Sequence, residues 1–326
     1  MYMETAICDY LREEIFPQFA PPPYGEIEMT SLGAQKPVCL FFEKKKNIVV
    51  VGKLFKWGIV TLEDAWLEAD KEYSNLKLLR EQLGMDGDAN RVVAPLGESK
   101  ELAALLVTER APGQTLDYYI AKAIFDQHQD ELFQTLGYLA RFFVRLHEAA
   151  KTERLLSPES PRFYLNSLLH SLSFGPAGYR ERTEIEEYAA RWWNEKSVFA
   201  SDRETIVHGD ATPTNFLFDN GNVTAIDLES MKRADRCWDL GFIAAELKHH
   251  FMWRTGNGWT AEPFIGHFLW QYALNYGDTN FFYVITRKLP LYMALGLLRI
   301  ARNFYIGDEQ IEYLVTEATQ CLKYGP

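Results

Sequence analysis

Residues Ile206 to Glu229, which read IVHGDATPTNFLFDNGNVTAIDLE, decide the fold. Their apolar segments predict that Asp210 and Asn215 lie on a loop between strands, with Asp227 at the end of a later strand. An Asp followed five positions on by an Asn suits a proton acceptor placed beside a metal ligand. Phosphoryl transfer from ATP needs one carboxylate to orient a hydroxyl group, and an amide and a carboxylate to hold Mg²⁺. The segment therefore indicates ATP- and Mg²⁺-dependent chemistry.

Three motifs in order resemble those of the aminoglycoside phosphotransferase/choline kinase superfamily, a branch of the protein-kinase-like fold. The family patterns H-G-D-x-x-x-x-N, I-D-[FWL]-E and D-[LIV]-[AG] are matched, in turn, by His208, Gly209, Asp210 and Asn215; by Asp227 and Glu229; and by Asp239, Leu240 and Gly241. The resemblance covers about Ile27 to Glu246 and is strongest from Ile206 onward. Three motifs at family-like spacing are much harder to obtain by chance than one.

The resemblance implies an α+β, two-lobed, protein-kinase-like fold. Residues 1–110 would form the nucleotide-binding lobe, an antiparallel sheet with one helix and a further N-terminal helix. Residues 111–326 would form a mostly helical lobe carrying the catalytic loop, the metal site and the acceptor site. Periodicity agrees, because it predicts helices at Glu4–Phe16 and Thr61–Leu83 and strands at Gly25–Leu32, Val38–Phe42, Ile48–Phe55, Val92–Leu96 and Leu102–Thr108. Further helices are expected at Leu116–His128, Glu131–Ala149, 155–200 and Ala261–Tyr324.

The family roles carry over to matching positions. Asp210 would accept or orient the acceptor hydroxyl, Asn215 would bind one Mg²⁺, and Asp227 would bridge the metal ions. Glu229 would bind Mg²⁺ through water or contact the acceptor, although a plain surface Glu is equally open. His208 and Asp239 are expected to be structural, with Asp239 accepting hydrogen bonds from amides of the catalytic loop. Glu246 falls where choline kinases have an acidic acceptor-site residue, and a solvated helix Glu is the alternative.

Lys53 lies within the apolar strand IVVVGKLF, residues 48–55. A lysine in such a strand needs a counter-charge, because an unpaired buried ammonium is costly. The kinase solution is a lysine that touches the α- and β-phosphates and pairs with a helix Glu. Glu72 fits the family's helix pattern, while Lys56 and Glu68 are the competitors.

Two further contacts with ATP are expected near the sheet. The segment MTSLGAQKP, residues 29–37, has a single glycine, so it is no glycine-rich loop, and Ser31 is the candidate contact to the β-phosphate. Adenine is expected to pair with backbone groups near Thr108 and Arg110, just before the hinge-like Ala-Pro-Gly at 111–113.

Composition narrows the partners and the compartment. A formal charge of −11 argues against nucleic acid and would favour a cationic acceptor, although acidic surfaces also serve solubility. The four cysteines form no CxxC pair, so a reducing, cytoplasmic location is expected. The acidic N-terminal segment predicts no signal peptide, and the apolar stretch Leu289–Ile300 is too short to span a membrane. Oligomeric state is not indicated.

The acceptor stays open among an aminoglycoside-like amine, choline or another amino alcohol, and a sugar or homoserine. A protein kinase is disfavoured by the missing A-P-E motif and by Gly209 in place of Arg. A catalytically inactive nucleotide-binding scaffold is the rival of another class. Trp192, Trp193 and Trp238 are expected in the core rather than in a cation–π box. The adjacent residues His249 and His250 point about 100° apart on a helix, so we expect no metal pair there.

Overall fold

The computed structural model describes residues 2–32, 38–87, 89–150, 152–172, 178–303 and 305–325. It divides into two compact units. Unit 1 comprises the chain up to Pro112 together with Thr224–Ser230, and unit 2 comprises Gly113–Val223 and the chain from Met231 onward. The segment that carries Asp227 was expected in the helical lobe, but it packs with unit 1.

Unit 1 is built on an antiparallel sheet whose outer strands are β1 and β5. The strand order is β1 (Ile27–Ser31), β2 (Val38–Glu43), β3 (Ile48–Leu54), β6 (Leu105–Glu109) and β5 (Pro95–Ser99). The expected hairpin between β2 and β3 turns at Asn47, whose φ of 57° is a conformation that asparagine tolerates well.

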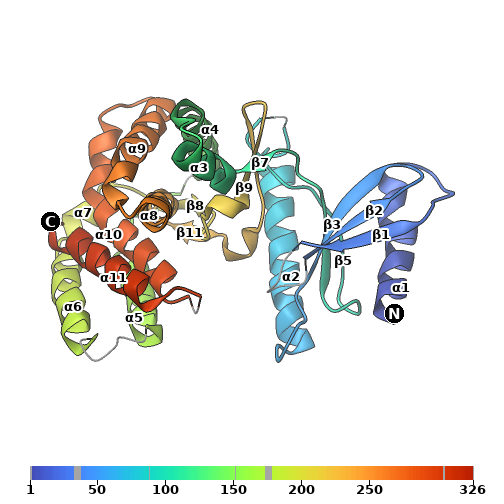
Figure 1. The fold of residues 1–326 in the computed structure, drawn as a ribbon, viewed down its shortest axis with the longest axis horizontal. Helices are drawn as coiled ribbons and strands as arrows, with labels where there is room; N and C mark the ends of the chain where they lie inside the picture. The colour runs from blue at the N-terminus through green and yellow to red at the C-terminus, as the bar shows by residue number, and fades with distance from the viewer. Residues whose placement is uncertain are drawn as a thin grey trace. The chain divides into compact units, whose positions relative to one another are not determined.

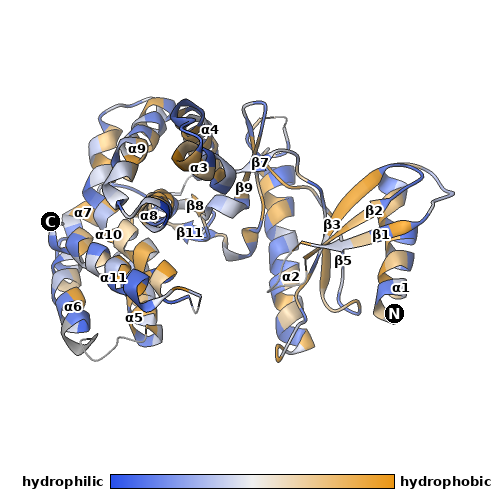
Figure 2. Cartoon of the chain, viewed as in Figure 1, coloured by the Kyte–Doolittle hydropathy of each residue, from blue (hydrophilic) through white to orange (hydrophobic). Residues whose placement is uncertain are grey.

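Helical segments cover the two faces of this sheet, as Figure 1 shows for α1 and α2. They are α1 (Tyr2–Tyr10), η1 (Leu11–Ile15) and η2 (Phe16–Gln18) on one side, and α2 (Leu62–Lys77) and η3 (Leu78–Gln82) on the other. Ile48 and Val50 of β3 pack with Leu11 and Ile15 in one buried apolar cluster. Because side chains alternate along a strand, Lys53 lies on the opposite face, toward α2. Figure 2 shows the apolar residues gathered along β2 and β3.

Two short strands account for the place of residues 224–230. β10 (Asn222–Ala225) pairs in parallel with β4 (Arg91–Val92), and η5 (Leu228–Ser230) follows. Asn75 of α2 donates a hydrogen bond of 2.8 Å to the carbonyl oxygen of Leu228. The expected strand Val92–Leu96 is therefore divided between β4 and β5, because Val92 pairs with Ala225 whereas Pro95 pairs with Thr108.

Unit 2 is mostly helical, with short strands around the HGD loop, the segment His208–Asn215. The helices are α3 (Leu116–Phe125), α4 (Gln129–Glu148), α5 (Glu159–Ser171), α6 (Gly178–Asn194), α7 (Lys196–Phe199), α8 (Cys237–Thr255), α9 (Glu262–Tyr276), α10 (Phe281–Ala301) and α11 (Asp308–Lys323). Short 3₁₀ turns are η4 (Pro213–Asn215) and η6 (Gly258–Ala261), and the strands are β7 (Gln114–Thr115), β8 (Thr205–Val207), β9 (Phe216–Asp219) and β11 (Lys232–Ala234). β7 pairs with β9 and β8 with β11, so the HGD loop lies between β8 and β9.

α10 is longer than the apolar stretch recognised in the sequence. It runs for 21 residues and is the one helix, within the ranges given above, that is long and apolar enough by composition to cross a membrane. About two thirds of its most apolar window (67%) is buried inside the protein. A core helix has the same properties, so this is weak evidence for a membrane span. The length argument from Leu289–Ile300 was wrong, and the absence of a span stays a prediction.

Two glycines allow α8 and α10 to approach closely. A Cβ on Gly241 of α8 would lie 2.5 Å from the Cβ of Tyr292, and a Cβ on Gly296 of α10 would lie 2.6 Å from the Cβ of Ala245. Both contacts are shorter than packed carbon atoms permit, so this helix pair depends on the missing side chains. The close approach also brings Arg299 of α10 to Glu246 of α8, at 3.4 Å.

We expect Gly296→Ala to destabilise the protein by about 1–3 kcal/mol, because the added methyl group overpacks the α8–α10 contact. Gly266→Ala is the matched control, since Gly266 is also helical but has no atom within 4 Å of the place that an added Cβ would take. There alanine should be neutral or stabilise by up to about 1 kcal/mol through helix propensity. Urea-induced unfolding of the two variants measures the difference, and equal stabilities would contradict the tight contact.

Candidate active site

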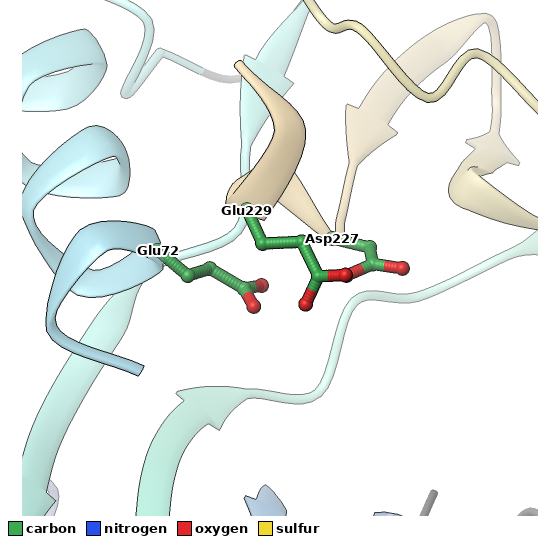
Figure 3. Close-up of side chains that lie close together, drawn as sticks. All are labelled: Glu72, Asp227 and Glu229. Atoms are coloured by element: carbon green, nitrogen blue, oxygen red, sulfur yellow. The ribbon is translucent and has the colours of Figure 1, made fainter. Parts of the chain in front are cut away.

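In unit 1, the ammonium group of Lys53 is surrounded by three carboxylates. Its Nζ lies 2.7 Å from Oε2 of Glu72, 2.5 Å from Oδ1 of Asp227 and 2.9 Å from Oε2 of Glu229. Figure 3 shows the three acidic side chains converging from α2 and from the segment after β10. The structure thus pairs Lys53, not Lys56, with Glu72, not Glu68, and it adds two carboxylates to the pair expected from the sequence.

The backbone at Asp227 helps to aim its carboxylate. Asp227 has a φ of 63°, in the left-handed region that non-glycine residues seldom occupy. Aspartate tolerates this conformation better than most residues do. Leu228 is buried and its carbonyl is held by Asn75, so the surrounding packing fixes the turn and hence the Asp227 side chain.

The electrostatics of this cluster are dominated by burial and by the three acids. Burial by itself lowers the pKa of Lys53, but Glu72, then Asp227 and Glu229, raise it well above its usual range, so the lysine is charged. Burial also raises the pKa of the Glu72 carboxyl, against the opposing effect of Lys53. Oxygen atoms of Glu72, Asp227 and Glu229 lie within 4.8 Å of one another. This donor set is hard and anionic, as Mg²⁺ prefers.

The other residues expected to contact ATP lie in or next to the sheet. Ser31 is exposed at the end of β1, opposite Cys39. The rest of the expected phosphate loop, 33–37, lies outside the described residues. Thr108 is half-buried in β6 between Val51 and Pro95, and Arg110 is exposed just after that strand.

In unit 2, the buried carboxylate of Asp239 holds the start of the HGD loop. Its Oδ2 accepts a hydrogen bond of 2.7 Å from the amide of His208, and its Oδ1 accepts one of 3.0 Å from the amide of Gly209. Gly209 has a φ of 83°, which favours glycine, and this turn presents both amides to one carboxylate. His208 is buried beneath the loop, with its ring 5.1 Å from that of Phe216.

A chain of buried polar groups supports Asp239 from behind. Arg236 donates to the hydroxyl of Tyr272 at 3.1 Å, and that hydroxyl lies 2.8 Å from Nδ1 of His147. Nε2 of His147 lies 3.1 Å from Asp239. Burial lowers the pKa of His147 despite the adjacent Asp239, so the ring is neutral. With Nε2 protonated, His147 donates a hydrogen bond to Asp239 and accepts one from Tyr272. Each of these buried polar side chains then has a hydrogen-bond partner.

Asp210 and Asn215 meet within the HGD loop. The Nδ2 group of Asn215 donates to the backbone oxygen of Asp210 at 2.9 Å and to its Oδ2 at 3.2 Å. These bonds fix the amide so that its oxygen is the atom left to serve as a ligand. The two residues are therefore placed as a carboxylate with an adjacent amide oxygen.

Arg299 is the polar neighbour of Asp210 that the sequence did not reveal. Its NH2 group donates to Oδ1 of Asp210, and its NH1 group lies 3.4 Å from Oε1 of Glu246. Burial raises the pKa of Glu246 to about 7, against the lowering by Arg299. In the sequence Arg299 only marks the end of an apolar stretch, so no local pattern identifies it. Glu246 is thus buried in an ion pair, not solvated.

The tryptophan and histidine residues considered as binding-site candidates make contacts within the protein itself. Trp192 is buried and its Nε1 donates to the carbonyl of Leu322 at 3.1 Å. Trp238 is also buried, and the ammonium of Lys232 lies 3.2 Å from the centroid of its ring. His249 stacks on Trp253, with ring centroids 6.2 Å apart. His250 lies 3.3 Å from Asp117, so the two histidines face different partners.

The sequence of this chain matches a known family model, the phosphotransferase enzyme family, over residues 63–269. No protein of curated function matches the sequence.

Solved structures with the same fold include a ternary complex of streptomycin, ATP and APH(2")-IIa (14% identity, TM-score 0.61), covering 99% of each chain. A choline kinase from Cryptosporidium parvum has 11% identity and a TM-score of 0.64, covering 98% of this chain and 94% of that one. An ethanolamine kinase from Plasmodium vivax has 12% identity and a TM-score of 0.61, covering 98% of this chain and 88% of that one. The fold is accordingly the α+β kinase-like fold expected from the sequence.

Substitutions in the Lys53 cluster test whether Lys53 and Glu72 act as a pair. In a double-mutant cycle, Lys53→Met and Glu72→Gln should be coupled by about 0.5–3 kcal/mol in the free energy of unfolding, because each removes the other's partner. Lys56→Met is the control. The Lys56 ammonium lies 3.4 Å from the carbonyl oxygen of Gly58 and is partly exposed. It should change stability by less than about 0.5 kcal/mol. Additive effects of Lys53→Met and Glu72→Gln would show that the pair is not an energetic unit.

Proposed function

The chain belongs to the phosphotransferase enzyme family, and from this premise we propose that it transfers the γ-phosphate of ATP to a hydroxyl group of a small cationic molecule. The observation that carries the proposal is the HGD loop. Asp239 fixes its first two amides, and Asn215 is bound to Asp210. A loop held in this way keeps a carboxylate and an amide in fixed positions, and phosphoryl transfer depends mainly on positioning.

Asp210 orients the acceptor hydroxyl and takes its proton as the reaction proceeds. The hydroxyl oxygen forms a bond to the γ-phosphorus, the bond from that phosphorus to the β–γ bridging oxygen breaks, and ADP leaves. Because the transition state is loose, Asp210 need not be a strong base. His208 and Asp239 act on the reaction through the loop, since Asp239 accepts hydrogen bonds from two loop amides and the His208 ring packs near Phe216 beneath the loop.

Lys53 is proposed to bind the α- and β-phosphates of ATP. It is charged, and Glu72 at 2.7 Å holds its side chain away from the apolar face of the sheet. The phosphates would take the place of Asp227 and Glu229 beside the ammonium. Ser31 is proposed as a β-phosphate contact, and backbone groups near Thr108 and Arg110 as the partners of adenine.

Asn215 and Asp227 are proposed as the ligands of Mg²⁺, with Glu229 binding the ion through water or contacting the acceptor. The donor chemistry supports this, since these residues offer an amide oxygen and carboxylate oxygens. When bound, Mg²⁺ would neutralise charge on the phosphates.

The acceptor is proposed to be cationic because Glu246 and the overall charge of −11 favour positive ligands. Amino alcohols and aminoglycoside-like amines belong to this class. A sugar or homoserine is the alternative acceptor, and an inactive nucleotide-binding scaffold is the alternative of another class. All four cysteines are free thiols, which supports a reducing, cytoplasmic compartment.

We expect ATP binding to require Mg²⁺ or Mn²⁺, because Asn215 and Asp227 bind the phosphates only through a metal ion. Calorimetric titration of ATP in Mg²⁺ and in EDTA measures the dependence. Asp227→Asn should weaken the Mg²⁺-dependent binding, whereas Asp219→Asn, a strand aspartate outside the motifs, should not. Equal ATP affinity in both buffers would exclude the metal assignment.

The experiment that tests the function is a panel of acceptors with labelled ATP. Choline, ethanolamine and aminoglycosides are compared with neutral sugars and homoserine, at low and high ionic strength. We expect a cationic compound to be phosphorylated, with a KM that rises with salt because charges in solvent-accessible sites are screened. Asp210→Ala should lower kcat by roughly 10²-fold or more with ATP affinity little changed. Phosphorylation of neutral sugars alone would refute the cationic acceptor, and full turnover by Asp210→Ala would refute the catalytic assignment.

A further inference from the structure

Arg299 is held inside unit 2 by two carboxylates that belong to different segments. One guanidinium nitrogen donates to Asp210 of the HGD loop, and the other lies 3.4 Å from Glu246 of α8. The Arg299 side chain is 16% exposed, so the charge is partly desolvated and depends on these partners. A single cation therefore bridges the proposed catalytic carboxylate and the proposed acceptor-site carboxylate.

An aromatic face completes the surroundings of this cation. The guanidinium carbon of Arg299 lies 5.5 Å from the ring centroid of Phe242, which is buried one helical turn before Glu246 on α8. Two carboxylates and an aromatic face are the groups that recognise an organic cation. The place that Arg299 occupies is thus itself a cation-binding site, and the chain fills it with its own side chain.

This contact also involves the atoms of Asp210 that the reaction needs. Arg299 engages Oδ1, and Asn215 engages Oδ2 at 3.2 Å. A hydroxyl group that is to be oriented by Asp210 has to compete with Arg299 for Oδ1.

We propose that Arg299 is an internal substitute for the cationic group of the acceptor. An ammonium or guanidinium group of the acceptor takes its place beside Glu246 and Phe242, and Arg299 swings away. Oδ1 of Asp210 is then free for the acceptor hydroxyl. Without a cationic acceptor, Arg299 returns and keeps Asp210 from activating water.

The charges around the site favour exchange with a cation over recruitment of an anion. Asp210, Glu246 and Asp117 face Arg299 and Arg254, and Arg254 is already paired with Asp117 at 2.8 Å. Burial and Arg254 lower the pKa of His250 to about 3, so this neighbour of Glu246 is neutral. An anionic acceptor would be repelled by three carboxylates. It would gain little from the guanidinium of Arg299, which is already paired with Asp210 and Glu246. A cationic acceptor would instead replace the guanidinium of Arg299, a cation for which the site already has partners.

The inference rests on the proposed function, and Arg299→Gln tests it. If Arg299 occupies the site about nine-tenths of the time, its removal should lower the KM of a cationic acceptor roughly 10-fold. Acceptor-independent ATP hydrolysis should rise as well, because Asp210 is released. Arg302→Gln is the matched control, since Arg302 is an exposed arginine just beyond the end of the same helix, and it should leave both quantities unchanged.

A chemical readout separates exchange from a structural role. Added methylguanidinium should inhibit Arg299→Gln in competition with the acceptor, since it restores the missing cation, and should inhibit the wild type far less. Arg299→Lys keeps a cation and should retain a KM near that of the wild type, which provides a second variant should glutamine unfold the protein. A raised KM for cationic acceptors in Arg299→Gln, or no competition by methylguanidinium, would overturn the proposal.

Failure of the proposed function would look different. In that case the wild type would phosphorylate no member of the panel, or its turnover would persist in Asp210→Ala. If turnover depends on Asp210 and an anionic acceptor is used best, with its KM raised by Arg299→Gln, the kinase assignment stands and Arg299 binds the acceptor directly. That result would reject only the proposal that Arg299 stands in for the acceptor's cationic group.

Discussion

The buried carboxylate of Asp239 is the interaction on which the HGD loop depends. It accepts hydrogen bonds from the amides of His208 and Gly209 and from His147, and its side chain is fully buried. An ionised carboxylate out of water is tolerated only with such donors, since leaving it unpaired costs several kcal/mol. The same need for donors fixes the loop, because two of the three are its backbone amides.

That requirement extends through the core of unit 2. His147 can donate to Asp239 only in one tautomer, which Tyr272 secures by donating to the other ring nitrogen. Arg236 in turn bonds Tyr272, and it pairs with Asp202 at 3.0 Å and with Glu148 at 3.1 Å. The loop geometry therefore depends on α4, α8 and α9 together. A fully satisfied network of this kind specifies one arrangement of its elements.

Prediction from sequence succeeded where the information was local and failed where it was not. The HGD loop was recognisable because Asp210 and Asn215 stand at short spacing, and Asp239 because it begins a third short motif, Asp239-Leu240-Gly241, in family-like order. Lys53 was identifiable because a charge in an apolar strand needs a partner, and a helix face offered Glu72. Neither argument reaches Arg299, whose partners lie 53 and 89 positions away and are set by the close approach of α8 and α10. The sequence also did not predict that residues 224–230 belong to unit 1, because a parallel pairing of only two residues leaves no periodic pattern in the sequence.

Both clusters follow one electrostatic rule. The acids that would serve the reaction are already compensated by a cation of the chain, namely Lys53 for Glu72, Asp227 and Glu229, and Arg299 for Asp210 and Glu246. Compensation lets the acids be buried without a ligand, which would otherwise destabilise the fold. Because the acids are compensated, a charged ligand would bind by displacing an existing ion pair. Its binding free energy would then be the difference between the free energy of its own contacts and that of the contacts it displaces. A neutral ligand cannot take over the compensated charge and gains nothing from the exchange, so the arrangement favours charged ligands through a difference in free energy rather than through shape.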